Sequence, residues 1–381
     1  MQMMIKELGE IITGNTPSKK IEGFWNSEDI CFIKPDIIAD NGITEIYESN
    51  ECISEEARQK ARVVLKDAIL VTCIGSIGKI GITADGEYAF NQQINAIIPN
   101  EKVNSKYLAY NLLFNKPRLI AIANAPVVPI INKSQFGDFF VSIEENIDKQ
   151  VEIVKVLDKL TSIIEQRKNE LFTLDDLIRA RFVEMFGDPV SNSYDLPEDT
   201  LSDLGEFGRG VSKHRPRNDI KLLGGKYPLV QTGDVANAGL YITSYGNTYS
   251  ELGLRQSKMW DKGTLCITIA ANIAKTAILE FDACFPDSVV GFIANERTNN
   301  IFIHYWFSFF QAILESQAPE SAQKNINLKI LSELKVIVPE KRKQDEFASF
   351  VKLTDKSKAV VQKSLEETQL LFDSLMQKYF G

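Results

Sequence analysis

Two glycines and a lysine at positions 75–79 have the composition of a phosphate-binding loop. The segment Gly75-Ser-Ile-Gly-Lys79 offers backbone N–H groups and one amine, which are groups that hold phosphate. The nucleotide-binding spacing GxxxxGK[ST] is not met, because two residues are missing and Ile80 follows the lysine. Nucleotide hydrolysis is therefore not expected. A tight turn between strands and a loop that meets a DNA phosphate both remain open.

Basic side chains are concentrated in the segment RGVSKHRPR, residues 209–217. Arginine and lysine pair with phosphate, and they also read guanine in the major groove. The segment is interpreted as a DNA-contacting loop, with a solvated loop as the alternative. Asn91, Gln92 and Gln93 could read adenine, because Asn and Gln bond that base bidentately, or could simply form a turn.

The chain offers little for catalysis. The segment Asn124-Ala-Pro-Val127 is a near miss for the Asn-Pro-Pro-aromatic motif of adenine methyltransferases, and no glycine-rich cofactor loop follows a strand. Of the two histidines, His304 lies in an apolar segment and is interpreted as a hydrogen-bonded core residue. The five cysteines form no CxxC pair. Neither a catalytic group nor a metal or cofactor is expected.

Composition predicts an ordinary soluble protein. The chain has 381 residues, 44% hydrophobic and 25% charged, with a net charge of −8. That charge does not favour nucleic-acid binding by the chain as a whole, so any DNA contact must come from local clusters or partner subunits. No signal peptide and no membrane-length apolar run are visible, and unpaired cysteines suit a reducing cytoplasm.

A long helix is predicted between Lys149 and Gly187, which would position these segments. Its apolar residues alternate at spacings of four and three, the heptad rhythm of a coiled coil. Gly187 and Pro189 end it. At 1.5 Å per residue the helix would be roughly 58 Å long.

The same stretch returns at Lys343–Gly381 after a shift of 194, without a gap. Where the first copy has Arg167 and Arg181 in its seam, the second has Val361 and Leu375. The seams look complementary, which favours pairing of the two helices within one chain. Two separate core helices are the alternative.

The repeat extends to the segments before each helix. A shift of 196 places Ile5–Glu10 on Leu201–Glu206. Each segment reads as a small mixed α/β unit with short strands and Gly, Pro and Asn turns. Strands are predicted at 30–33, 68–73, 79–83 and 95–98, repeated at 229–231, 264–269, 276–279 and 289–293, with helices at 105–113 and 301–314.

Connectivity then predicts the architecture. The second long helix must travel back along the first to pair with it, so the pair is antiparallel with one mixed α/β unit at each end and a pseudo-two-fold axis. The predicted segments are a first unit at 1–145, a central helix at 146–188, a second unit at 189–338 and a C-terminal helix at 339–381.

This arrangement resembles the specificity subunits of type I restriction–modification systems, which have two target recognition domains separated and followed by similar helical regions. Gly14-Asn-Thr-Pro-Ser18, Phe32-Ile-Lys-Pro-Asp36, Gly75–Lys79 and Asn91-Gln-Gln-Ile94 resemble segments of such recognition domains. The second unit departs from them, with Ala271-Asn-Ile-Ala-Lys275 and Pro286-Asp-Ser-Val289 at the corresponding places. The proline-rich entry to the helical region survives only in part, as residues 339–344.

The resemblance implies a non-catalytic subunit that reads a bipartite, asymmetric site on double-stranded DNA. It implies partners as well: two methyltransferase (modification) subunits and restriction endonuclease subunits. A coiled-coil scaffold without DNA binding and a stand-alone DNA-binding regulator are the alternatives. The predicted DNA-contacting residues are Thr16, Ser18, Lys19, Lys20, Ser76, Lys79, Asn91, Gln92, Gln93, Arg209, Ser212, Lys213, His214, Arg215, Arg217, Asn272 and Lys275.

Overall fold

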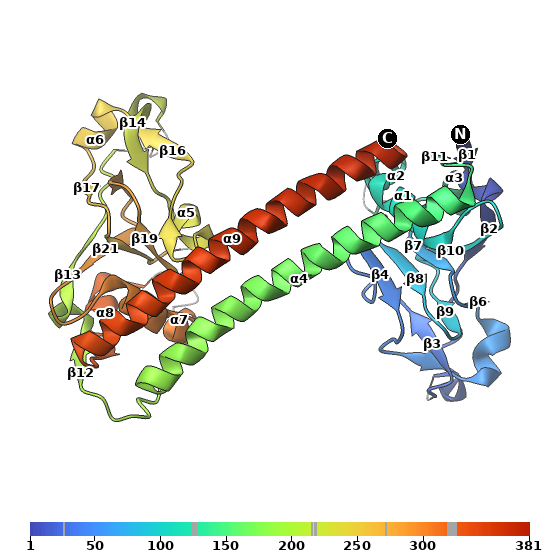
Figure 1. The fold of residues 1–381 in the computed structure, drawn as a ribbon. Coiled ribbons are helices and arrows are strands. Elements are labelled where there is room, and N and C mark those ends of the chain that lie inside the picture. The colour runs from blue at the N-terminus through green and yellow to red at the C-terminus, as the bar shows by residue number, and fades with distance from the viewer. Residues whose placement is uncertain (26, 124–127, 215, 217–218, 271–272, 318–325) are drawn as a thin grey trace. The chain divides into compact units, whose positions relative to one another are not determined.

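The computed structural model describes residues 1–25, 27–123, 128–214, 216, 219–270, 273–317 and 326–381 (Figure 1). The chain divides into two compact units. Unit 1 comprises Met1–Lys168 with Lys363–Gly381, and unit 2 comprises Asn169–Gln362. Each unit therefore includes one end of each long helix. The four-segment division predicted from the sequence remains a prediction.

The two long helices are α4 (Ile147–Phe186) and α9 (Lys341–Phe380), of 40 residues each. Both predicted helices are confirmed, with ends within two residues of the expected positions. Gly187 stops α4 with a φ of +75°, and its N–H donates to the Val183 carbonyl at 2.8 Å. A left-handed residue at this position is a common helix end that glycine adopts without strain.

Unit 1 contains a five-stranded sheet in the order β2-β10-β7-β8-β4, a four-stranded sheet in the order β5-β3-β9-β6, and the pair β1-β11. Its strands are β1 (Gln2–Met4), β2 (Gly9–Thr13), β3 (Ile30–Ile33), β4 (Ile43–Ile46), β5 (Cys52–Ile53), β6 (Val63–Val64), β7 (Ile69–Thr72), β8 (Ile80–Thr83), β9 (Tyr88–Phe90), β10 (Ile94–Pro99) and β11 (Phe140–Ser142). Its helices are α1 (Ser105–Phe114), α2 (Lys116–Ile122), α3 (Lys133–Gly137) and the 3-10 turns η1 (Ile5–Glu7), η2 (Glu22–Phe24) and η3 (Glu55–Lys60).

Unit 2 repeats these sheets as β13-β21-β18-β19-β15, β16-β14-β20-β17 and β12-β22. Its strands are β12 (Glu198–Thr200), β13 (Gly205–Arg209), β14 (Leu223–Leu229), β15 (Tyr241–Ile242), β16 (Asn247–Tyr249), β17 (Met259–Trp260), β18 (Leu265–Thr268), β19 (Thr276–Leu279), β20 (Ala283–Cys284), β21 (Val289–Ala294) and β22 (Lys335–Ile337). Its helices are α5 (Thr232–Asn237), α6 (Glu251–Arg255), α7 (Asn300–Gln317), α8 (Leu328–Ser332) and the 3-10 turns η4 (Leu201–Asp203) and η5 (Ile220–Leu222).

The matching strand orders confirm the predicted repeat of a mixed α/β unit. Predicted strands 30–33 and 276–279 are observed with the same bounds, as β3 and β19. The strand predicted at 229–231 is wrong beyond Leu229. There β14 ends and Gln231 becomes the N-cap of α5, with its backbone N–H donating to the Asp234 carboxylate at 2.8 Å. The helix-capping contact competes with continued strand pairing at this point.

Opposite ends of α4 and α9 pack together within each unit. In unit 1, Leu157 near the start of α4 is buried in the same cluster as Phe380 at the end of α9. In unit 2, Phe186 at the end of α4 packs against Phe347 near the start of α9, with ring centroids 5.7 Å apart. The predicted antiparallel pairing is therefore confirmed in both units. No helix among the described residues has the length and apolar character that crossing a bilayer requires.

A buried glutamine fixes the first turn of each long helix. Gln150 of α4 accepts from the Asn104 N–H at 2.8 Å and donates to the Lys102 and Glu144 carbonyls at 3.1 and 2.7 Å. Gln344 of α9 accepts from the Thr298 hydroxyl at 2.8 Å and donates to the Arg297 and Pro339 carbonyls at 3.0 and 2.8 Å. Both side chains are fully buried. Each amide therefore ties one long helix to the unit that precedes it.

Replacing this amide is expected to destabilise the fold. Gln344→Leu keeps a similar volume but leaves the two carbonyls and the Thr298 hydroxyl without their partner. A buried polar group that loses its partner costs about 1–3 kcal/mol. Urea unfolding should show a lower midpoint for Gln344→Leu, while Lys343→Leu at the exposed neighbouring position should change stability by less than about 0.5 kcal/mol. Equal urea midpoints for the two variants would contradict the proposal that the Gln344 amide stabilises the fold.

His304 of α7 is partly buried and lies against β19 in unit 2. Its Nδ1 lies 2.9 Å from the Thr276 hydroxyl, and burial lowers its pKa from 6.5 to about 4. The hydrogen bond predicted from the sequence is therefore present, although the side chain lies at the margin of the core and not inside it. Because it must stay neutral in the folded state, protonation favours unfolding.

The free energy of unfolding should therefore decrease as the pH is lowered, because of this residue. Between pH 6.5 and about 4 the unfolded chain binds a proton at His304 that the folded chain does not. The stability of the fold is therefore unaffected by this residue above pH 6.5 and decreases as the pH is lowered below that value. Because the side chain is partly exposed, the loss should stay below about 3 kcal/mol. Urea unfolding from pH 7 to pH 4.5 should show a shallower pH dependence for His304→Asn than for the natural chain. Parallel pH profiles would contradict this expectation.

Candidate nucleic-acid interface

In unit 1, a glycine brings the loop after β2 against the turn between β9 and β10. The Gly14 N–H donates to the Ile94 carbonyl at 3.0 Å, and a Cβ at this position would lie 2.1 Å from the Asn91 carbonyl oxygen. Only glycine allows this approach. As a result the Thr16 hydroxyl donates to the Gln92 side-chain oxygen at 2.8 Å. Two groups of predicted DNA-contacting residues, at 16–20 and 91–93, are thus brought together.

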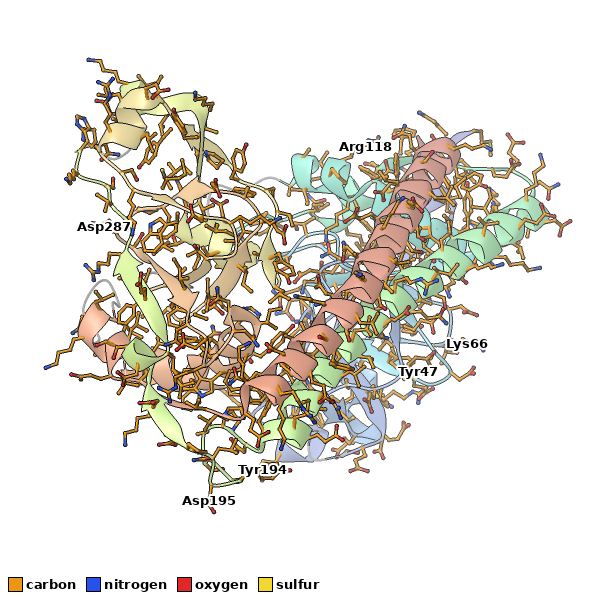
Figure 2. All side chains as sticks on the ribbon, turned by 60° about the vertical axis from the view of Figure 1, so that its left-hand side comes forward. Tyr47, Lys66, Arg118, Tyr194, Asp195 and Asp287 are labelled. Atoms are coloured by element: carbon orange, nitrogen blue, oxygen red, sulfur yellow. The ribbon has the colours of Figure 1, made fainter. Side chains whose placement is uncertain are left out.

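The same glycine-dependent backbone contact occurs in unit 2, where Gly210 follows β13. Its N–H donates to the Val289 carbonyl at 2.9 Å, and a Cβ would lie 2.2 Å from the Phe285 carbonyl oxygen. The basic segment therefore begins beside the turn between β20 and β21. Asp287, labelled in Figure 2, belongs to this turn.

The third predicted group of unit 1 lies in the hairpin turn between β7 and β8. The Cys73 N–H donates to the Gln93 carbonyl at 2.7 Å, which joins this turn to residues 91–93. The Lys79 N–H donates to the Thr72 hydroxyl at 3.0 Å, and in unit 2 the Lys275 N–H donates to the Thr268 hydroxyl at 3.1 Å. The tight turn considered from the sequence is therefore present, and a phosphate contact by its exposed residue Ser76 remains a prediction.

The predicted residues of unit 1 differ in accessibility. Asn91 is buried, and its amide donates to the Gln93 side-chain oxygen at 2.9 Å, so its amide is engaged inside the turn. The Lys79 side chain is only 12% exposed, and its amine contacts the Pro35 carbonyl at 3.2 Å and Asp40 at 3.1 Å. Gln93 is partly exposed. The exposed residues of the set are Thr16, Ser18, Lys19, Lys20, Ser76 and Gln92.

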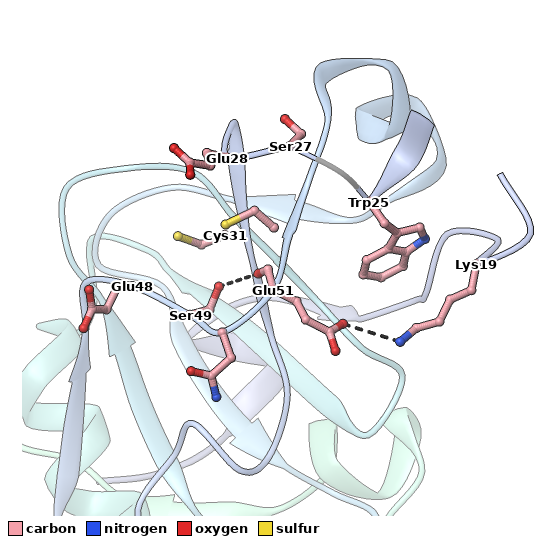
Figure 3. Close-up of a pocket in the computed structure, with 10 residues that line it drawn as sticks. Lys19, Trp25, Ser27, Glu28, Cys31, Glu48, Ser49 and Glu51 are labelled. Carbon is pink, nitrogen blue, oxygen red and sulfur yellow. Dashed lines mark hydrogen bonds and ion pairs between the residues drawn. The ribbon is translucent and has the colours of Figure 1, made fainter. Parts of the chain in front are cut away.

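Lys19 stands at the edge of a hollow of about 660 Å³ (Figure 3). Its amine lies 5.0 Å from the centre of the Trp25 ring and 3.5 Å from the Glu51 carboxylate. A hydrogen bond from Lys34, helped by the charges of both lysines, lowers the pKa of Glu51. Glu51 is thus ionised and shared by two lysines, and the exposed Lys19 ammonium remains able to meet a second anion.

In unit 2 the structure places part of the basic segment. Arg209, Lys213 and His214 are exposed, whereas Ser212 is buried. The His214 ring lies 3.1 Å from Asp219, whose pKa is lowered by the Lys221 N–H and then by His214. Three predicted contacts, Arg215, Arg217 and Asn272, lie outside the described residues.

One residue that contacts the basic segment was not identified from the sequence. Gln256 accepts from the His214 N–H at 3.0 Å through its side-chain oxygen. It precedes β17 and is 42 positions away in the chain. No local pattern connects the two residues, so only the tertiary structure identifies Gln256 as a support of the basic segment. Among the described residues, no three or more His, Cys, Asp and Glu side chains gather in a way that could hold a metal ion.

The chain matches the family model described as the type I restriction modification DNA specificity domain twice, over residues 1–173 and 198–368. It belongs to the type I restriction–modification specificity-subunit family. The two matches correspond to the two repeats, each beginning in a mixed α/β unit and continuing into a long helix. The resemblance stated from the sequence is therefore confirmed.

Curated relatives include two specificity subunits of Methanocaldococcus jannaschii. The MjaIX subunit is 27% identical over 274 residues, covering 67% of this chain and 62% of the relative; the putative MjaX subunit is 22% identical, covering 84% and 78%. The HindI subunit of Haemophilus influenzae is 33% identical over 109 residues, covering 28% of this chain and 23% of the relative. The first alignment thus spans less than two thirds of the relative's length.

Solved structures agree in fold. The S subunit of the M. genitalium type I restriction–modification system aligns over 100% of this chain and 96% of its own, with a TM-score of 0.62 and 15% identity. A second chain, from work on complex assembly and conformational transition of the type I R-M system, covers 100% and 97% with a TM-score of 0.59 and 13% identity. At these identities the likeness concerns the specificity-subunit fold alone.

Proposed function

We propose that this chain is the non-catalytic DNA-recognition subunit of a type I restriction–modification complex and reads a bipartite, asymmetric site on double-stranded DNA. One observation carries the proposal: both units hold the same loop against the same turn through Gly14 and Gly210, yet the loops present different side chains. Unit 1 presents Thr16 with Gln92, and unit 2 presents Arg209, Lys213 and His214. Two such loops of different chemistry suit two different blocks of bases.

The proposed partners are two methyltransferase subunits, one for each repeat, and restriction endonuclease subunits where the system has them. The long helices offer apolar side chains for docking. Phe172 of α4 and Leu353, Val360 and Leu370 of α9 are 67–70% exposed. We take these exposed apolar side chains as the proposed contact points for the partner subunits. A duplicated chain offers each partner an equivalent surface, which favours a 2:1 complex.

The test is co-expression with the cognate methyltransferase subunit. The complex should methylate an asymmetric two-part site, and the lone chain should neither methylate nor cut DNA nor bind S-adenosylmethionine. Leu353→Glu with Leu370→Glu should abolish co-purification, whereas Lys352→Glu at an exposed neighbouring position should not. A complex that forms without binding DNA would favour a scaffold, and site-specific binding by the lone chain would favour a stand-alone regulator.

A further inference from the structure

Two cysteines face each other across the strand pair β3 and β5 of unit 1. Cys31 and Cys52 are direct partners in this antiparallel pair, next to the partners Ile30 and Ile53. The Phe32 N–H donates to the Glu51 carbonyl at 2.8 Å, so the cysteines occupy a non-hydrogen-bonded position. At such positions the Cα atoms are about 4.5 Å apart and side chains lie closest. That separation falls within the range that a disulfide can bridge.

The surroundings hold these two thiols in place and leave them accessible. Ile30 and Ile53 are completely buried in one cluster with Phe32, which fixes both strands. Because side chains alternate along a strand, Cys31 and Cys52 point to the other face. Both are partly exposed and line the hollow beside Lys19 and Trp25 (Figure 3). The other three cysteines of the chain, Cys73, Cys266 and Cys284, are buried.

We propose that Cys31 and Cys52 form an oxidisable dithiol site, which a low-molecular-weight disulfide such as glutathione disulfide converts to an intramolecular disulfide. One protein thiolate attacks a sulfur of glutathione disulfide and releases one glutathione. The other protein thiolate then attacks the bound protein sulfur and releases the second glutathione. The two protein thiols lose two electrons, glutathione disulfide gains them, and the two thiol protons pass to the released glutathione molecules.

Burial raises the pKa of the Cys52 thiol, and the neighbouring Cys31 raises it further. Because the thiolate is the attacking species, a higher pH should speed the attack by Cys52. The product would close a ring from Cys31 to Cys52 that contains β4, and cross-links of this kind stabilise the folded state.

The test uses the full-length, reduced chain under native conditions. After exposure to glutathione disulfide, free thiols are capped with N-ethylmaleimide, and the digest is analysed by mass spectrometry. A linked peptide pair containing Cys31 and Cys52 should become the main product, while the three buried cysteines are capped only after denaturation. Cys52→Ser should instead accumulate one glutathione at Cys31, because the closing thiol is missing.

Cys73→Ser is the matched control, since it removes a buried thiol elsewhere in unit 1 and should leave the linked pair unchanged. Persistent glutathione on Cys31 or Cys52 of the natural chain, or a linked pair that appears only in denaturant, would overturn the proposal. Since the natural chain gives the decisive readout, a folding defect in a variant does not obscure it.

Discussion

Cutting the chain after Asp188 should change the methylated site from two different blocks to one block repeated in inverted orientation. The half-length chain keeps the mixed α/β part of unit 1 and the helix α4, but it loses α9. In the natural chain, Met376 and Phe380 of α9 are buried in the core of unit 1 with Val154 and Leu157 of α4. The cut exposes this apolar surface, and exposed core surface favours association.

A second copy of the half-length chain can cover that surface. The shift of 194 places Phe182 on Met376 and Phe186 on Phe380. In the natural chain Phe182 and Phe186 are completely buried in unit 2 against Phe347, and the cut removes that environment. Two half-length chains can therefore exchange the ends of their α4 helices in a symmetric dimer. A true two-fold axis then relates two copies of the mixed α/β part of unit 1, which predicts a palindromic DNA site.

Methylome mapping of cells that carry the half-length gene with the methyltransferase measures this outcome directly. Phe182→Glu with Phe186→Glu in the half-length chain should abolish dimer formation and methylation. Arg179→Glu, at an exposed position on the same helix, should preserve dimer formation. An unchanged asymmetric site, or a soluble monomer with its helix folded, would contradict the proposed exchange.

The basic segment of unit 2 should account for a large share of the salt-dependent affinity of the complex. Replacing Lys213, Arg215 and Arg217 by Ala removes three positive charges from the loop that follows Gly210. Each lost phosphate contact lowers the slope of log affinity against log salt by about 0.9, so loss of all three should lower it by about 2.7. Titration of the assembled complex with DNA at several salt concentrations gives this slope.

The matched control is Lys226→Ala, Lys262→Ala and Lys329→Ala, which removes the same charge from side chains that are 62–80% exposed elsewhere in unit 2. Its slope should stay near that of the natural complex, and both triple variants should unfold at the natural temperature. Equal slopes for the two triple variants would mean that the segment 209–217 is solvated surface.

The elements set by local pattern were predictable. The heptad spacing of Lys149–Gly187 and its repeat at Lys343–Gly381 located α4 and α9 within two residues, because helix hydrogen bonds and side-chain periodicity involve near neighbours. Short strands bounded by turns were found in the same way, as with β3 and β19. The internal repeat then predicted two similar units. The strand expected to reach Gln231 was wrong because a helix cap competes for that residue.

The composition of the candidate interface was largely decided by long-range contacts. Thr16 and Gln92 are 76 positions apart and meet because Gly14 permits a close backbone approach. Lys79 is less accessible than its sequence context suggested, because Asp40 and the Pro35 carbonyl hold its amine. Residue type and spacing identify which side chains could meet DNA. Which of these side chains remain exposed, and which others lie beside them, depends on how the strands pair. Strand pairing joins segments that are far apart in the chain, and the local sequence of one segment does not specify its partner.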